Sequence, residues 1–131
     1  MIEAFFRIHL HAPLRNARWS WGAVRAVDGA VFVRVWQDEK IRRESSWYMR
    51  LTAHKFFADK EDNLGWQERL AHMKLVQGGA PSYMVMCEAV DPAAPVREIR
   101  SFDNHGIFVG GKMVEHEGDF WLEIKSRLSI R

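Results

Sequence analysis

The sequence predicts a mostly β domain of the α+β class: a small, strongly curved sheet or barrel with one clear helix and room for one or two short ones. Three observations predict it. The chain has 131 residues, the length of one domain, so we expect a single domain over 1–131. Short segments of alternating apolar and polar residues are separated by turn residues at short intervals. One stretch alone has helical spacing followed by a clear stop.

The first element predicted is a strand over 6–10, where Phe6, Ile8 and Leu10 alternate with basic side chains. A turn-prone segment follows over 12–18. Alternation with a period of two is typical of a half-buried strand, so these three apolar side chains are expected to share one face.

A hairpin is predicted next, with arms over 24–27 and 30–36 on either side of the turn pair Asp28-Gly29. In the second arm one face carries valine and the other carries larger side chains. These two faces are Val31, Val33 and Val35, and Phe32, Arg34 and Trp36.

The polar run 37–46 is predicted to be a loop or a short helix, and the alternating segment 47–52 a strand. Residues 53–62 have no pattern that assigns them. A helix is predicted from Asn63, ending at Gly78-Gly79 before Pro81.

The remainder is predicted to be strands. The segment 83–90 is dense in apolar side chains and is expected to be buried on both faces. Turns are expected at Asp103-Asn104, Gly110-Gly111 and Glu117-Gly118. Between them lie three short strand-like pieces, 107–109, 112–115 and 120–125.

Composition excludes several classes of protein. Nineteen basic against 17 acidic residues give a formal charge of +2, which permits a nucleic-acid partner without requiring one. A single cysteine, Cys87, excludes an internal disulfide framework and a zinc site built on several thiolates. No apolar run approaches the ~18 residues that span a bilayer, and the N-terminus lacks the pattern of a signal peptide. We therefore expect a soluble cytoplasmic protein with no membrane partner and no cofactor.

Tryptophan is abundant, with six in so short a chain. Flat aromatic rings can hold a planar base, and a neighbouring Ser or Asp can hydrogen-bond the base edge. The candidate base-binding residues on this reasoning are Trp19, Ser20, Trp21, Trp36 and Asp38, with Trp47 nearby. The alternative is that a helix or loop covers these tryptophans and they belong to the core.

Basic residues flank these aromatics, as a phosphate backbone beside a base pocket requires. The candidate phosphate-binding residues are Arg15, Arg18, Lys40, Arg42 and Arg43, with Arg25 and Arg34 in the same set. Acidic residues at 38, 39 and 44 lie in the same stretch. An ordinary mixed solvated surface is therefore the alternative.

Two enzymatic hypotheses remain as alternatives. His9 and His11, two apart on a strand, point the same way and are able to share a metal. Asp103 with Glu123 and Lys125 has the sparse pattern of a divalent-metal-dependent nuclease or hydrolase. Neither has diagnostic spacing, and Cys87 lies in an apolar segment where a thiol is ordinarily inert, so we do not expect an enzyme.

The segments Arg18-Trp19-Ser20-Trp21-Gly22-Ala23 and 31–39 resemble the modified-base-recognition modules of modification-dependent restriction endonucleases, often of the HNH type. Segments 82–91 and 97–103 fit the same resemblance, which thus covers most of the chain. Such modules resemble the PUA-like superfamily, which includes EVE, YTH and ASCH domains.

This resemblance implies a strongly curved PUA-like β-barrel whose aromatic pocket accepts a modified base, flipped from duplex DNA or taken from a single strand. Carried over residue by residue, it implies the same five base-binding candidates, with Asp103 as a further one. The nuclease half is absent from these 131 residues, which puts cleavage in doubt. We therefore expect a nucleic-acid reader, with modified cytosine in DNA favoured and RNA second. It would act alone, recruit a separate nuclease effector, or form part of a larger protein. A protein-interaction module, such as a homodimer, is the third class.

Overall fold

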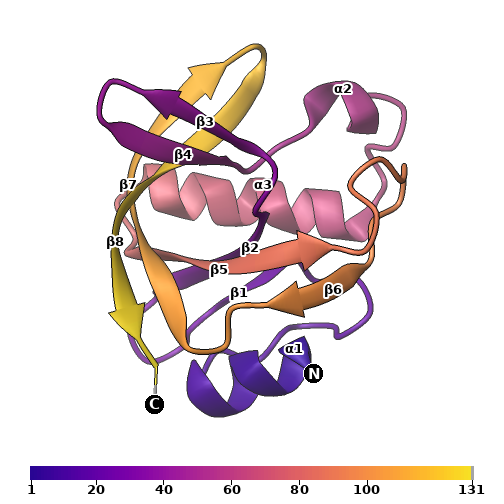
Figure 1. Ribbon diagram of the computed structural model, residues 1–131. Coiled ribbons are helices and arrows are strands. Elements are labelled where there is room, and N and C mark those ends of the chain that lie inside the picture. Colours follow the sequence, from indigo (N-terminus) through magenta and orange to yellow (C-terminus); the bar gives the residue numbers. More distant parts are fainter. Residues whose placement is uncertain (131) are drawn as a thin grey trace.

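The computed structural model describes residues 1–130 and is mostly β (Figure 1). Its strands form one eight-stranded sheet in the order β1-β2-β5-β7-β8-β4-β3, with β6 paired to β5. The strands are β1 (Gly22–Val24), β2 (Val31–Trp36), β3 (Lys40–Arg43), β4 (Ser46–Arg50), β5 (Ser82–Ala89), β6 (Ile99–Phe102), β7 (Gly106–His116) and β8 (Asp119–Ser129). The helical segments are α1 (Ile2–Ala4), η1 (Phe5–His9), α2 (His54–Phe57) and α3 (Leu64–Gln77).

Strands β2 and β5 form the centre of the domain. They run parallel, from Val31 opposite Ser82 to Trp36 opposite Cys87. The predicted hairpin is confirmed, because β1 pairs antiparallel with β2 across the Asp28-Gly29 turn. The valine face of β2 packs against α3, β4 and β8, and its opposite face packs against the N-terminal helical segment. The burial predicted for the β5 segment is also confirmed, since both core clusters contain β5 residues.

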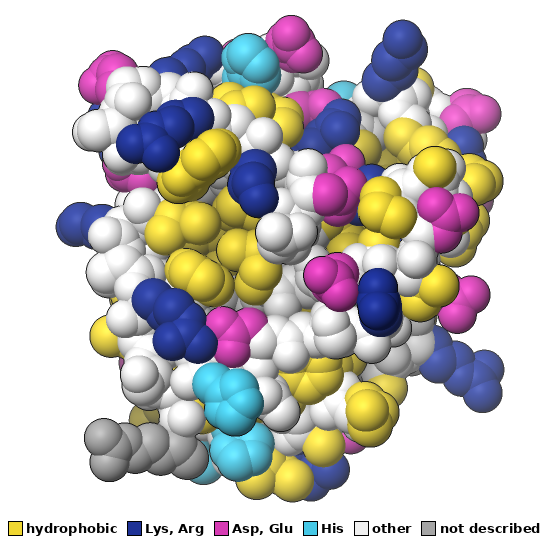
Figure 2. Space-filling model, viewed as in Figure 1, with side chains coloured by type: hydrophobic (Ala, Val, Ile, Leu, Met, Phe, Trp, Pro, Cys, Tyr) yellow, Lys and Arg dark blue, Asp and Glu magenta, His cyan; other side chains and the backbone are white. Residues whose placement is uncertain are grey.

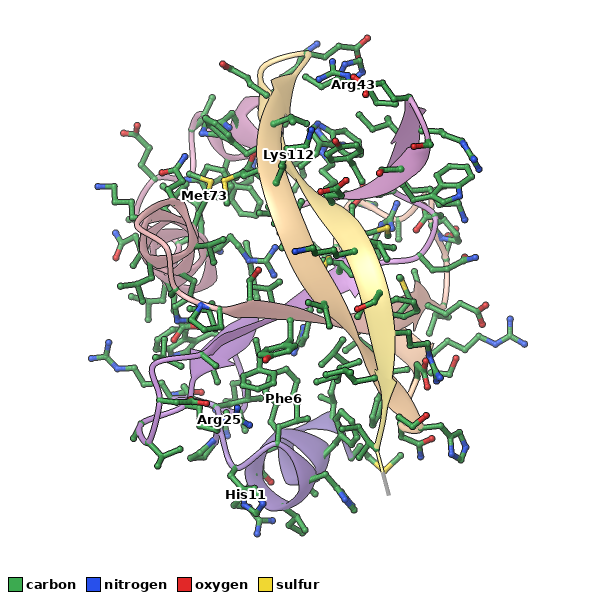
Figure 3. All side chains as sticks on the ribbon, turned by 90° about the vertical axis from the view of Figure 1, so that its left-hand side faces the viewer. Phe6, His11, Arg25, Arg43, Met73 and Lys112 are labelled. Carbon is green, nitrogen blue, oxygen red and sulfur yellow. The ribbon has the colours of Figure 1, made fainter. Side chains whose placement is uncertain are left out.

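The predicted strand over 6–10 is wrong, because this segment is helical. Leu10 N–H donates to the carbonyl of Phe5 and Ala12 N–H to that of Phe6, so the turn is wider than an α-helical one. Phe5 and Phe6 are adjacent and both buried, which a strand with one face inward does not allow. Figure 3 shows Phe6 between this segment and the sheet and His11 on the outer side. The shared strand face assumed for His9 and His11 does not exist.

The predicted long helix is confirmed as α3. The side chain of Asn63 caps its start by accepting a hydrogen bond from Trp66 N–H, and Gly78 follows its last turn. Arg69, in its middle, is buried and donates to the backbone carbonyls of Leu51, Trp21 and Arg34. This one side chain ties α3 to the chain segments that follow β4, precede β1 and form β2.

Two predictions for the polar and glycine-rich segments are wrong. Within the run 37–46, β3 is a strand that pairs with β4 through a two-residue turn at Glu44-Ser45. Gly110-Gly111 is not a turn either, since β7 continues through it with a shift in register. A Cβ on Gly110 would overlap Ser82 Oγ and crowd Leu122, so glycine is required where β7 crosses its neighbours. The turns at Asp103-Asn104 and Glu117-Gly118 lie between strands as predicted.

The sheet is strongly bent. Val35 of β2 and Met49 of β4 belong to the same core cluster, although three strands separate β2 from β4 in the sheet order. Among residues 1–130 the pairing ends at β1 on one side and β3 on the other, so the sheet does not close, and α3 packs against it at β1 and β2. No helix in this part of the chain is long and apolar enough to cross a membrane.

Candidate functional site

A buried hydroxyl helps to hold the loop over 16–21 against α3. Ser20 is 1% exposed, and its Oγ donates to Glu68 Oε2 at 3.2 Å and accepts from Asn16 N–H at 3.0 Å. Asn16 Oδ1 in turn accepts from Arg18 N–H. The loop is therefore pinned at its centre, with Trp19 on one side of Ser20 and Trp21 on the other.

Trp19 lines a groove of about 540 Å³ between this loop and α3. The predicted phosphate-binding residue Arg15 lines the same groove. The structure thus brings one base-binding and one phosphate-binding candidate together. The complete lining is Pro13, Arg15, Trp19, Ala23, Val24, Leu64, Gln67, Glu68, Ala71 and His72.

Three polar side chains of α3 line this groove, and two of them, Glu68 and His72, lie one helical turn apart. His72 is 7% exposed, and its buried Nδ1 has no hydrogen-bond partner among the described residues. Glu68 Oε1 is likewise buried without a partner, while Oε2 is the acceptor for Ser20. Burial, with a smaller contribution from the charge of Arg69, lowers the pKa of His72 to about 4, so the imidazole is neutral at pH 7. Burial raises the pKa of the Glu68 carboxyl.

Trp21 lies at the junction of α2 and α3 instead of in the groove. Its ring centroid is 5.3 Å from that of Phe57, and the guanidinium of Arg69 lies 5.7 Å from its ring. Phe57 in turn stacks on Trp66 at 4.7 Å with an interplanar angle of 7°. The backbone of Gly65 lies directly against the indole, leaving no space for a Cβ.

Trp36 and Asp38 form a second group with a residue that sequence reasoning did not single out, Arg97. Its guanidinium binds both carboxylate oxygens of Asp38, at 2.7 and 2.9 Å. The same guanidinium lies 5.4 Å from the centroid of the Trp36 ring. Trp36 is half-buried and packs against the core cluster of the N-terminal segment. Neither residue lines the Trp19 groove.

Asp103 belongs neither to the Trp19 groove nor to the group of Trp36, Asp38 and Arg97. It accepts from Arg127 at 2.8 Å and lines a shallower hollow of about 320 Å³ together with Gln37, Glu88 and Ser101. Glu123 accepts from Ser46 Oγ and Lys112 N–H instead.

Positions 123 and 127 of β8 are roughly 13 Å apart along a strand. Because Asp103 is bound by Arg127, it does not share a site with Glu123. In residues 1–130 no three His, Cys, Asp or Glu side chains are placed to hold a metal ion. The structure therefore does not assemble either arrangement that the enzymatic hypotheses require.

Two of the three basic candidates of β3, Lys40 and Arg42, lie near an exposed tryptophan. Lys40 Nζ lies 5.7 Å and the Arg42 guanidinium 5.3 Å from the ring of Trp47, which is 40% exposed. Arg43 contacts His116 Nδ1 at 3.3 Å. Within the described chain none of these three cations forms an ion pair with a carboxylate. Figure 2 shows Lys and Arg side chains around hydrophobic ones over this part of the sheet. Arg18 is exposed on the loop that carries Trp19.

Sequence reasoning missed the polar lining of the groove. Glu68 and His72 are four residues apart in a segment that was correctly predicted to be helical, so they had to share a helix face. That spacing was the available signal. The spacing alone could not place the 16–21 loop, which lies beside this helix face only in the tertiary structure.

No family model, curated protein or solved structure with which the chain was compared matches it.

Proposed function

We propose that the chain is a nucleic-acid reader that accepts a single base, with modified cytosine in DNA favoured, in the groove lined by Trp19. The observation that carries this proposal is the convergence of Trp19, Arg15 and the polar pair Glu68 and His72 on one groove. Aromatic, cationic and hydrogen-bonding groups are the three kinds of contact that a nucleotide requires. RNA bearing a modified base is the second substrate class.

The fold supports the same proposal at a coarser level. A single bent sheet carries α3 on one side of β2, with a second core on the other side of β2 and β5. We propose that this is a version of the strongly curved PUA-like barrel, opened between β1 and β3. In such a fold a loop beside the sheet is a suitable position for a pocket, and here that loop carries Trp19.

The proposed binding has two energetic parts. Extruding a base from a duplex costs a few kcal/mol, and stacking on an aromatic ring returns roughly 1–3 kcal/mol per base. Trp19 alone therefore does not offset extrusion, and hydrogen bonds within the groove must supply the remainder. A damaged, mismatched or single-stranded base costs less to extrude and should bind more tightly.

Phosphates are proposed to be held by Arg15 at the groove and by Arg18 beside it. The β3 cations with Trp47 form a second basic surface, where an aromatic ring near two cations suits a nucleotide outside the groove. Both surfaces make affinity depend on salt, because each phosphate contact releases counterions. Ser20 is proposed to act indirectly, since its hydroxyl is already engaged by Glu68 and Asn16. The reader would signal through a separate effector, such as a nuclease.

The test is a fluorescence-anisotropy titration with matched oligonucleotides. The set comprises duplex DNA and RNA, unmodified or carrying modified cytosine or adenine, at two salt concentrations. We expect selective, salt-sensitive tightening on one modified oligonucleotide. Trp19→Ala should weaken that binding at least tenfold, because it removes the stacking surface.

Trp36→Ala is the matched control, since this tryptophan lies outside the groove. The melting temperature of each variant separates lost binding from lost folding. Absence of binding to every oligonucleotide at low salt would contradict the proposed function. Loss of binding in Trp36→Ala with retention in Trp19→Ala would move the base site to the Trp36–Arg97–Asp38 group.

A further inference from the structure

We infer that Glu68 and His72 read the hydrogen-bonding edge of the bound base and select an edge with an amino donor beside a ring-nitrogen acceptor. Cytosine, its C5-modified forms and adenine present this edge. The inference rests on the proposed function and deepens it, because it names the class of base that the Trp19 groove accepts.

The first step is the placement of the two side chains. Glu68 and His72 lie at positions i and i+4 of α3, so they are neighbours on one face of the helix. Both line the groove that Trp19 also lines. A base that stacks on Trp19 therefore lies beside this helix face.

The second step is that each of the two side chains has one polar atom that forms no hydrogen bond within the described residues. Glu68 Oε1 and His72 Nδ1 are buried and have no partner within residues 1–130. Buried polar atoms in folded proteins are nearly always hydrogen-bonded, because an unpaired one has lost its water without gaining a partner. His72 is also packed close to the backbone of Gly22, where an added Cβ would lie 3.4 Å from Nδ1. Both unpaired atoms are shielded from solvent, so a base in the groove gains them as partners only when the two side chains rotate toward it.

The third step is the direction of each hydrogen bond. A Glu68 carboxylate only accepts, so it suits an exocyclic amino group. The neutral His72 imidazole carries one N–H, which suits a ring nitrogen with a lone pair. Thymine and uracil present the reverse order, a carbonyl and a ring N–H, which would place two acceptors against each other at Glu68. Modification at C5 of cytosine leaves the selected edge unchanged.

The experiment uses the full chain and short single strands with one central variable nucleotide: C, 5-methyl-C, A, T or G. Single strands remove the cost of extrusion, so the base itself is compared. We expect the wild-type protein to bind the C, 5-methyl-C and A strands at least tenfold more tightly than the T strand. Glu68→Gln replaces an acceptor with a group that can also donate, and should reduce that preference to less than threefold. His72→Asn should reduce it similarly.

Glu61→Gln is the control, because it removes one carboxylate that lies outside the groove lining. It should retain the wild-type preference. Binding of all five strands with equal affinity by the wild-type protein would overturn the inference and leave the reader function standing. The same holds if Glu68→Gln and His72→Asn keep the wild-type preference. Failure of the wild-type protein to bind any strand would instead contradict the proposed function.

Discussion

The burial of His72 predicts a specific loss of stability in mild acid. Its pKa is lowered from 6.5 to about 4 in the folded protein, so the unfolded chain takes up the proton first as the pH falls. Stability is therefore full above pH 6.5 and decreases as the pH falls toward 4. Integrating the two titrations gives a loss of about 2 kcal/mol between pH 7 and pH 5.

Other groups titrate near this pH range, so we predict the difference in stability loss between the wild-type protein and a variant that lacks the His72 imidazole. Burial raises the pKa of Glu68, whose contribution therefore grows as the pH falls and opposes that of His72. Carboxyls with lowered pKa values, such as Asp28 at about 2 and Asp119, lose their contributions mainly below the range. A non-titrating variant, His72→Gln, retains all of these and removes only the imidazole.

The assay is urea denaturation of the wild-type protein and His72→Gln at pH 7 and pH 5, followed by tryptophan fluorescence. The wild-type protein should lose about 2 kcal/mol more than the variant on acidification. For a chain of this length that corresponds to a difference of roughly 8 °C in the change of melting temperature. Equal losses in the two proteins would refute the reasoning, because His72 would then titrate alike in the folded and unfolded states.

Three further predictions concern the packing around α3 and the basic surface of β3. Arg69→Met removes the hydrogen bonds of this guanidinium to three backbone carbonyls, one of which, that of Trp21, keeps Arg34 N–H as a partner. It should cost about 3 kcal/mol in chemical denaturation, and an unchanged midpoint would show that solvent replaces the guanidinium. Gly65→Ala places a Cβ 2.5 Å from the indole of Trp21 and should destabilise the fold by about 1–3 kcal/mol, with a changed near-ultraviolet circular dichroism spectrum. An unaltered spectrum would contradict this packing. Arg42→Gln should lower the slope of log affinity against log salt concentration for duplex binding by about 0.9. An unchanged slope would show that the hairpin of β3 and β4 does not contact the duplex.

The candidate site was only partly predictable from the sequence. The tryptophans and cations could be singled out by residue type, but their grouping could not. Trp19 and Arg15 share a groove, whereas Trp36 pairs with Arg97 and Asp103 with Arg127. Arg97 and Arg127 are distant in sequence from their partners, so no local pattern indicates these ion pairs. Glu68 and His72 were overlooked because a polar helix face is ordinarily a solvated one.

By itself the sequence determined the elements whose signals are local. The Asp28-Gly29 turn, the Asn63 cap and the Gly78-Gly79 stop act within a few residues, and each predicted its hairpin or helix correctly. The tertiary structure decided the rest. The segment 5–9 alternates like a strand, yet it is helical, because packing Phe5 and Phe6 together beneath β2 buries more apolar surface than one strand face could. The groove likewise depends on contacts between residues that are distant in sequence, such as the hydrogen bond from Ser20 to Glu68 across 48 residues, and no local pattern encodes such a contact.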